Sequence, residues 1–158
     1  MVDTITQVSI QEKMRPNHCF GCGLDNPHGL HIKSYWEGEE VIGTWTPKDY
    51  MTGPPNFLYG GTSASLIDCH SVNAALAYLN KELGFEEAFS PALFMVTGSL
   101  TIKYLKPVPL KPVDLRSTVK KVDGRKYTVE TTISCDSVIC VIGEVIAIRI
   151  DADRFGKT

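Results

Sequence analysis

The sequence is short of net charge and of long hydrophobic runs. Sixteen basic side chains (Lys and Arg) and 18 acidic ones (Asp and Glu) give a formal net charge of −2 and a pI of about 6.1. This near balance argues against a polybasic surface for nucleic acid or for an anionic membrane. No apolar stretch reaches the roughly 18 residues that a membrane-spanning helix requires. We therefore expect no nucleic-acid partner and no membrane segment.

An export signal and an even set of cysteines are also missing. The first six residues contain no basic region followed by an apolar run, so no signal peptide is visible. The chain has five cysteines, and an odd number without an export signal favours reduced thiols over a disulfide framework. These features predict a cytoplasmic location. The cysteines are Cys19, Cys22, Cys69, Cys135 and Cys140.

The chain does have the length and the apolar content of one domain. Its 158 residues are 43% hydrophobic, enough for a substantial core, and they contain no internal repeat or low-complexity tract. We interpret residues 1–29 as an N-terminal extension. Within it, residues 3–14 predict a short helix that Pro16 ends, and the prolines and glycines of residues 16–29 predict an irregular loop. Residues 30–152 are expected to form the single domain.

The hydrophobic pattern of that domain predicts one helix between two groups of strands. Residues 61–83 carry apolar side chains on nearly every face, which is typical of a helix buried on most sides. The expected fold is therefore α+β, with an antiparallel sheet of five or six strands wrapped around one long central helix. One sheet edge would remain uncovered, which predicts a homodimer. The predicted strands comprise residues 30–36, 40–46, 94–105, 113–119, 127–133 and 138–150.

One carboxylate interrupts the apolar helix. Asp68 lies seven residues after the second glycine of the Gly60-Gly61 pair, and a carboxylate in that place is costly to bury without a partner. Two glycines at a helix entrance leave backbone N–H groups bare, where a carbonyl oxygen could bind. A polarised carbonyl beside a carboxylate that activates water is the chemistry of acyl hydrolysis. The alternative is a structural carboxylate that caps a loop N–H inside the core.

Three segments give the chain a resemblance to a known family. In their order and spacing they resemble the hotdog-fold thioesterase superfamily, in particular its PaaI-like and 4-hydroxybenzoyl-CoA thioesterase-like acyl-CoA thioesterases. The resemblance covers residues 18 to about 150. It implies a hotdog fold, a homodimer that often assembles further into a dimer of dimers, active sites at the dimer interface and no cofactor. The segments are His18-Cys19-Phe20-Gly21-Cys22-Gly23 with Asn26-Pro27 and Gly29-Leu30, Gly60-Gly61 with Leu66-Ile67-Asp68, and the run from Val96 to Pro109.

The resemblance also implies catalytic roles for particular residues. A backbone N–H of Gly60 or Gly61 would polarise the thioester carbonyl. Asp68 would act as the general base that activates water, or as a nucleophile that attacks the carbonyl first. Thr97 matches the position of a hydroxyl residue that orients the water in some members. The implied substrate is acyl-CoA or an acyl-carrier thioester.

Two positions depart from the family pattern. Tyr59 stands where many members have His or sometimes Asn immediately before the glycine pair. Gly53 stands where some members have an Asn, and Asn56 lies nearby but out of register. We assign Tyr59 and Asn56 to substrate binding.

Other chemistries find less support in the sequence. Cys69 and His70 are adjacent in the predicted helix and point about 100° apart, so a nucleophile–base pair is not expected. Cys19 and Cys22 with nearby histidines resemble half of a zinc knuckle, but no second ligand pair follows them. We expect an ordered loop there and no metal. The functional alternatives are a non-catalytic acyl-ligand-binding module and a hydroxyacyl-thioester dehydratase, whose His-Phe-Pro type of signature is missing.

Overall fold

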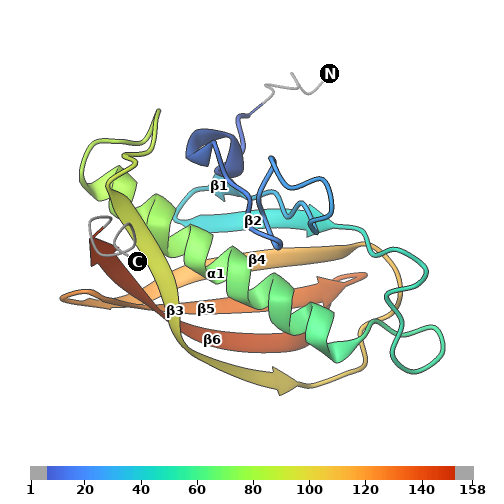
Figure 1. Ribbon diagram of the computed structural model, residues 1–158. Coiled ribbons are helices and arrows are strands. Elements are labelled where there is room, and N and C mark those ends of the chain that lie inside the picture. The colour runs from blue at the N-terminus through green and yellow to red at the C-terminus, as the bar shows by residue number, and fades with distance from the viewer. Residues whose placement is uncertain (1–6, 152–158) are drawn as a thin grey trace, which may run out of the picture.

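A six-stranded antiparallel sheet lies against a single long helix in the computed structural model, which describes residues 7–151 (Figure 1). The strand order is β1-β2-β4-β5-β6-β3, so β1 and β3 form the two edges. This arrangement confirms the predicted α+β fold with one central helix. The elements are η1 (Gln11–Met14), β1 (Tyr35–Glu37), β2 (Glu40–Trp45), α1 (Gly60–Glu82), β3 (Leu93–Tyr104), β4 (Val113–Asp123), β5 (Lys126–Cys135) and β6 (Val138–Asp151).

Helix α1 is buried over much of its surface, as its apolar sequence predicts. Twelve of its 23 residues are buried, and it packs against β3, β4, β5 and β6. The helix begins at Gly60, and Gly84 follows its C-terminus with φ +82°. Glycine adopts that left-handed conformation without a Cβ clash, which is why it often ends helices. Side chains of α1 face the middle of the sheet at His70, the β3 edge at Asp68 and the N-terminal loop at Cys69.

The predicted N-terminal helix is wrong over half of the part that the structure describes. Of residues 7–14, only Gln11–Met14 form a helical segment, a single 3-10 turn. Residues 3–6 lie outside the described range. The turn is tied into the fold through Gln11, whose amide donates to Ser34 Oγ at 3.1 Å and accepts from the Ser34 backbone N–H at 2.7 Å.

The first predicted strand is also shorter than expected. Of residues 30–36, predicted to pair with the next strand, only Tyr35 and Trp36 do so, and the strand continues to Glu37. The backbone of residues 30–34 hydrogen-bonds to the N-terminal segment instead: Leu30 N–H donates to Phe20 O at 2.7 Å, and Ile32 N–H donates to Gly21 O at 3.1 Å. Alternating hydrophobicity predicts an extended stretch but does not identify its partner.

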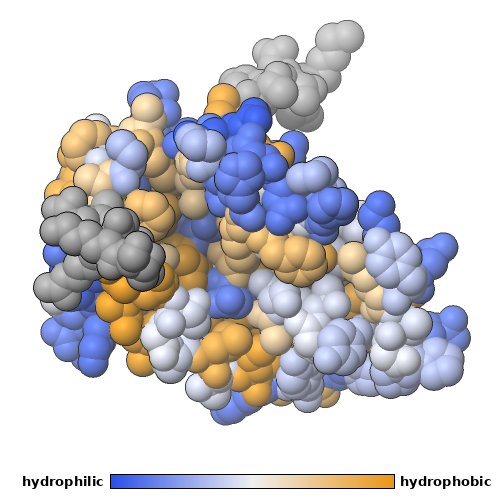
Figure 2. All heavy atoms as spheres, viewed as in Figure 1, coloured by the Kyte–Doolittle hydropathy of each residue, from blue (hydrophilic) through white to orange (hydrophobic). Residues whose placement is uncertain are grey.

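Strand β3 forms one edge of the sheet. Among the strands of residues 7–151 it pairs with β6 alone, and many of its side chains are exposed. Figure 2 shows apolar surface at the lower left of this face, where β3 runs. The exposed large apolar residues of β3 are Phe94, Leu100 and Tyr104.

Among residues 7–151, no helix combines the length and hydropathy needed to cross a bilayer.

Candidate active site

Asp68 and Thr97 meet on the side of α1 that faces β3. Thr97 Oγ1 donates a hydrogen bond to Asp68 Oδ1. Asp68 is half-buried and Thr97 is exposed. No other donor in residues 7–151 hydrogen-bonds to the Asp68 carboxylate. The carboxylate is thus held by a side chain at the surface and is not closed off against the protein's own backbone, as the structural alternative would require.

A β-bulge at Gly98 allows β3 to present two separate side chains to α1. The pairing with β6 shifts between Thr97 and Ser99, and a Cβ on Gly98 would lie 2.5 Å from Ile148 Cδ1. Before the bulge, Thr97 faces the helix, and after it Tyr104 does. These two positions are seven apart, so a regular strand would place them on opposite faces. The extra residue in the bulge reverses the alternation.

No side chain caps the N-terminus of α1 within the described residues. Tyr59 offers no capping hydrogen bond, and the backbone N–H groups of Gly60 and Gly61 have no acceptor within the described part of the chain. The first four N–H groups of a helix have no intrahelical partner, so these two can receive a ligand oxygen. The Gly60 carbonyl is occupied, because Tyr104 Oη donates to it at 2.7 Å. Tyr104 was not found from the sequence.

The two residues assigned to substrate binding occupy different places. Tyr59 is 60% exposed, and its ring covers Gly61, where a Cβ would lie 2.4 Å from a ring carbon. Burial, and then the neighbouring Tyr59, raise the pKa of Tyr104. Asn56 sits in the exposed loop before α1 with φ +69°, and its carbonyl accepts the Leu110 N–H at 3.1 Å. Its side chain makes no hydrogen bond to any described residue.

His70 points away from Asp68 into the core. It is fully buried, and its Nδ1 lies 2.6 Å from Ser117 Oγ on β4. Ser117 contacts Thr131 on β5, whose hydroxyl also lies 2.6 Å from Ser71 Oγ. Desolvation lowers the pKa of His70 to about 4. Asp68 and His70 thus face different strands, and they do not form an acid–histidine pair.

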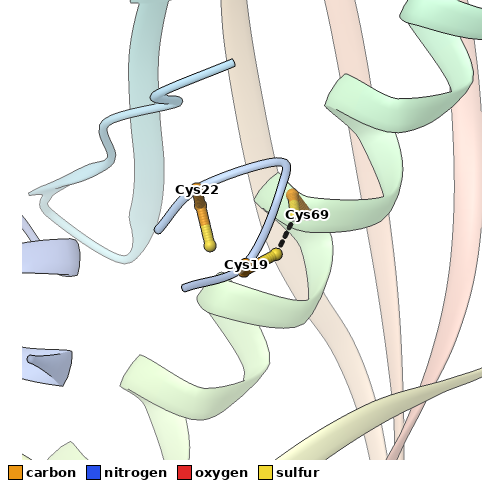
Figure 3. Close-up of side chains that lie close together, drawn as sticks. All are labelled: Cys19, Cys22 and Cys69. Atoms are coloured by element: carbon orange, nitrogen blue, oxygen red, sulfur yellow. Dashed lines mark hydrogen bonds between the residues drawn. The ribbon is translucent and has the colours of Figure 1, made fainter. Parts of the chain in front are cut away.

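Cys69 does not face a base either; it meets the two cysteines of the N-terminal loop. The sulfur atoms of Cys19, Cys22 and Cys69 all lie within 4.8 Å of one another (Figure 3). They line a cavity of about 350 Å³ that neither Asp68 nor Thr97 lines. The sequence indicated the pair Cys19 and Cys22 but not Cys69, because 47 residues separate Cys22 from it.

The architecture and the helix-borne carboxylate define an α+β hotdog domain of the thioesterase type. The profile of the thioesterase superfamily matches residues 55–141, just over half of the chain. The chain belongs to that superfamily.

Among curated proteins, the chain is 31% identical over 149 residues to acyl-coenzyme A thioesterase THEM4 from Rattus norvegicus. The match covers 91% of this chain but 59% of the rat protein, and 33% of the Xenopus laevis THEM4. The chain thus spans less than two thirds of these relatives.

Solved structures of similar length share the fold. A thioesterase superfamily protein from Shewanella loihica PV-4 is 34% identical, with a TM-score of 0.65 over 85% of this chain and 95% of that one. The PaaI protein from the E. coli phenylacetic acid degradation operon has a TM-score of 0.62, covering 77% of this chain and 80% of that one. At 17% identity, the second likeness concerns the fold alone.

Proposed function

We propose that this chain hydrolyses an acyl thioester, with acyl-CoA as the substrate class. The observation that carries the proposal is the hydrogen bond from Thr97 to Asp68 at the open side of α1. Membership in the thioesterase superfamily supports the reaction class. The name of the rat relative supports acyl-CoA as the form of the thioester.

In the proposed reaction Asp68 activates water and Thr97 positions it. Because the Thr97 hydroxyl donates its hydrogen to Asp68, its oxygen lone pairs remain able to accept a hydrogen bond from water. The second carboxylate oxygen of Asp68 is then available to take the water proton as the hydroxide attacks the thioester carbon. The thiolate leaves and is protonated. An attack by Asp68 itself, through an anhydride that water then opens, uses the same residues.

A backbone N–H of Gly60 or Gly61 stabilises the oxyanion that forms on the carbonyl. Within one chain, Gly61 and Asp68 are seven helical residues apart, roughly 10 Å along the axis. For direct attack by Asp68, a carbonyl that accepts a hydrogen bond at one end and is attacked at the other spans only about 7 Å. The resemblance to hotdog thioesterases implies active sites at a dimer interface, so the glycine N–H that works with Asp68 is proposed to come from a second copy of the chain.

A homodimer provides this arrangement. Thr97 lies on β3, an edge strand of the described sheet, and an edge strand can pair with a strand of another chain. A two-fold interface repeats the same contacts on both sides, so it would create two sites, each with Asp68 from one copy and Gly60-Gly61 from the other. Tyr59 and Asn56, at and before the helix entrance, are proposed to line the path of the acyl-CoA.

The experiment is a panel of acyl-CoAs of different chain length and aromatic character, with release of free thiol as the readout. We expect release from at least one of them. Single turnover in water labelled with heavy oxygen separates the two mechanisms, because label enters Asp68 only on the anhydride route.

The ring of Tyr59 over Gly61 favours one alternative, a non-catalytic acyl-ligand-binding module, because it covers a proposed oxyanion donor. Binding of acyl-CoA without thiol release from any member of the panel would establish the module and reject the hydrolase.

A further inference from the structure

Three sulfur atoms from distant parts of the chain converge beside α1. Cys19 and Cys22 come from the N-terminal loop and Cys69 from the helix, and Figure 3 shows all three side chains directed toward one another. Cys19 Sγ lies 3.6 Å from Cys69 Sγ. Sulfur ligands of a tetrahedral zinc ion, each about 2.3 Å from the metal, lie roughly 3.8 Å apart. A disulfide would involve only two of the three sulfurs.

The loop has a backbone shape that brings its sulfurs to the helix. The Gly23 N–H donates to Cys19 O at 2.8 Å and closes a tight turn. A Cβ on Gly21 would lie 2.2 Å from Cys69 Sγ, and a Cβ on Gly23 would lie 2.4 Å from the Cys19 backbone nitrogen. Because only glycine fits at both positions, the sequence Cys19-Phe20-Gly21-Cys22-Gly23 is shaped for this close approach.

One amide N–H lies against the sulfur of Cys22, and a second buried amide lines the same cavity. Asn17 Nδ2 lies 3.7 Å from Cys22 Sγ. Asn73 is 3% exposed, and its Nδ2 has no hydrogen-bond acceptor within residues 7–151. It lines the same cavity as the three cysteines. Donors that converge on a sulfur stabilise a thiolate more than a thiol, and such groups typically accompany metal ligands.

The cavity leaves room for one more ligand. It is lined by the three cysteines and has a volume of about 350 Å³, many times what one water needs. The nearby histidines do not turn toward the sulfurs, since His18 Nδ1 lies 3.2 Å from Asp25 O and His31 Nε2 contacts Asn26 O.

We propose that Cys19, Cys22 and Cys69 bind one Zn²⁺ ion as three thiolates, with a water from the cavity in the fourth position. Binding replaces three S–H protons by three S–Zn bonds and releases the protons to solvent, so no oxidant or reductant is needed. The ion would fasten the N-terminal loop to α1 at the residue after Asp68. This site is independent of the proposed hydrolysis.

The test begins with reduced, metal-free protein of the full chain, titrated with Co²⁺ and then with Zn²⁺. We expect one Co²⁺ per chain, with thiolate-to-cobalt charge-transfer absorption and tetrahedral d–d bands, and displacement of Co²⁺ by Zn²⁺. Cys69→Ala should weaken Zn²⁺ binding by more than about 10-fold. Mutating a residue that only hydrogen-bonds to a metal ligand already lowers metal affinity by about 10- to 100-fold. Cys140→Ala is the control, because Cys140 is a buried cysteine that lies outside the cluster.

A readout on the unaltered chain keeps the test decisive if Cys69→Ala does not fold. Bound Zn²⁺ should slow alkylation of Cys19 and Cys69, measured by mass spectrometry, without changing the alkylation of Cys135. Absence of thiolate–cobalt absorption, or equal Zn²⁺ affinity in a folded Cys69→Ala variant, overturns the proposal. A third outcome also overturns the proposal and indicates a redox pair instead. In that outcome Cys19 and Cys22 form a disulfide in a glutathione buffer at the cytosolic reduction potential, and Zn²⁺ does not slow their alkylation.

Discussion

Asp68 and His70 are two residues apart on α1, yet the helix presents them to very different surroundings. Asp68 is half-buried and receives one hydrogen bond, from the exposed Thr97 on an edge strand. His70 is fully buried and faces Ser117 in the middle of the sheet. The comparison shows that the neighbouring strand decides the role of a polar residue on a buried helix. An edge leaves it accessible for chemistry, and the sheet interior makes it part of the packing.

The largest effect is expected from Asp68→Asn. The amide oxygen can still accept the Thr97 hydrogen bond, but the amide cannot take a proton, so turnover of acyl-CoA should fall by about 10²- to 10⁴-fold. The melting temperature should stay close to that of the unaltered protein, because the side chain is only half-buried. Thiol release and thermal unfolding measure the two quantities. Near-normal turnover would show that Asp68 takes no part in the reaction, so that neither Asp68 nor His70 has a chemical role.

The second-largest effect is expected on the pH dependence of stability, through the buried His70. Burial lowers the pKa of His70 from 6.5 to about 4, so between these pH values the unfolded chain binds a proton that the folded chain does not. The free energy of unfolding should therefore decrease as the pH falls from about 6.5 to about 4, by on the order of 3 kcal/mol from this residue. The contribution is fully present above pH 6.5.

Urea unfolding at several pH values tests this prediction. In His70→Asn the protein should be less stable at neutral pH and should lose part of its pH dependence between pH 6.5 and 4. The control is His28→Asn, because His28 is exposed and should leave the dependence unchanged. If the free energy of unfolding of His70→Asn depends on pH as it does in the unaltered protein, burial of His70 does not oppose its protonation.

A smaller effect on turnover is expected from Thr97→Val, which keeps the shape of the side chain and removes its hydroxyl. A hydrogen bond to a charged group contributes about 1.5–3 kcal/mol, so turnover should fall by roughly 10-fold or more. Thr97→Ser should retain most of the activity. Thr101→Val, at an exposed position of the same strand, serves as the control. Equal losses at both positions would show that Thr97 acts only through the structure of the strand.

The smallest effect is expected from Tyr104→Phe. The variant loses the hydrogen bond from Tyr104 Oη to the Gly60 carbonyl, which is worth about 1 kcal/mol, and the helix entrance should become less rigid. We expect turnover to fall a few-fold. Tyr50→Phe is the control, because Tyr50 is 75% exposed in the loop before α1. No difference between the two variants would show that Tyr104 does not help to hold the glycine pair.

Elements with a strong local pattern could be predicted from the sequence. The helix predicted at residues 61–83 lies at Gly60–Glu82, and the strand predicted at residues 138–150 lies at Val138–Asp151. Burial on most sides produces continuous apolar stretches that can be read along the chain. Residues 30–34 were placed wrongly because the N-terminal segment, distant in sequence, takes up their backbone groups.

Long-range features of the site could not be predicted in the same way. The family resemblance singled out Asp68 and Thr97, and the structure adds the hydrogen bond between them. Tyr104 was missed because its direction depends on the bulge at Gly98, which alternation alone does not reveal. Cys69 was missed because ligand-spacing patterns look for short intervals, whereas Cys19 lies 50 residues away.

The bulge at Gly98 makes the number of residues in β3 as important as their identity. Removing one residue there would restore simple alternation and turn either Thr97 or Tyr104 outward, while the pairing with β6 could re-form on both sides. A related chain could therefore vary many side chains in this strand, but a deletion at this point would separate Asp68 from its threonine or the glycine pair from its tyrosine.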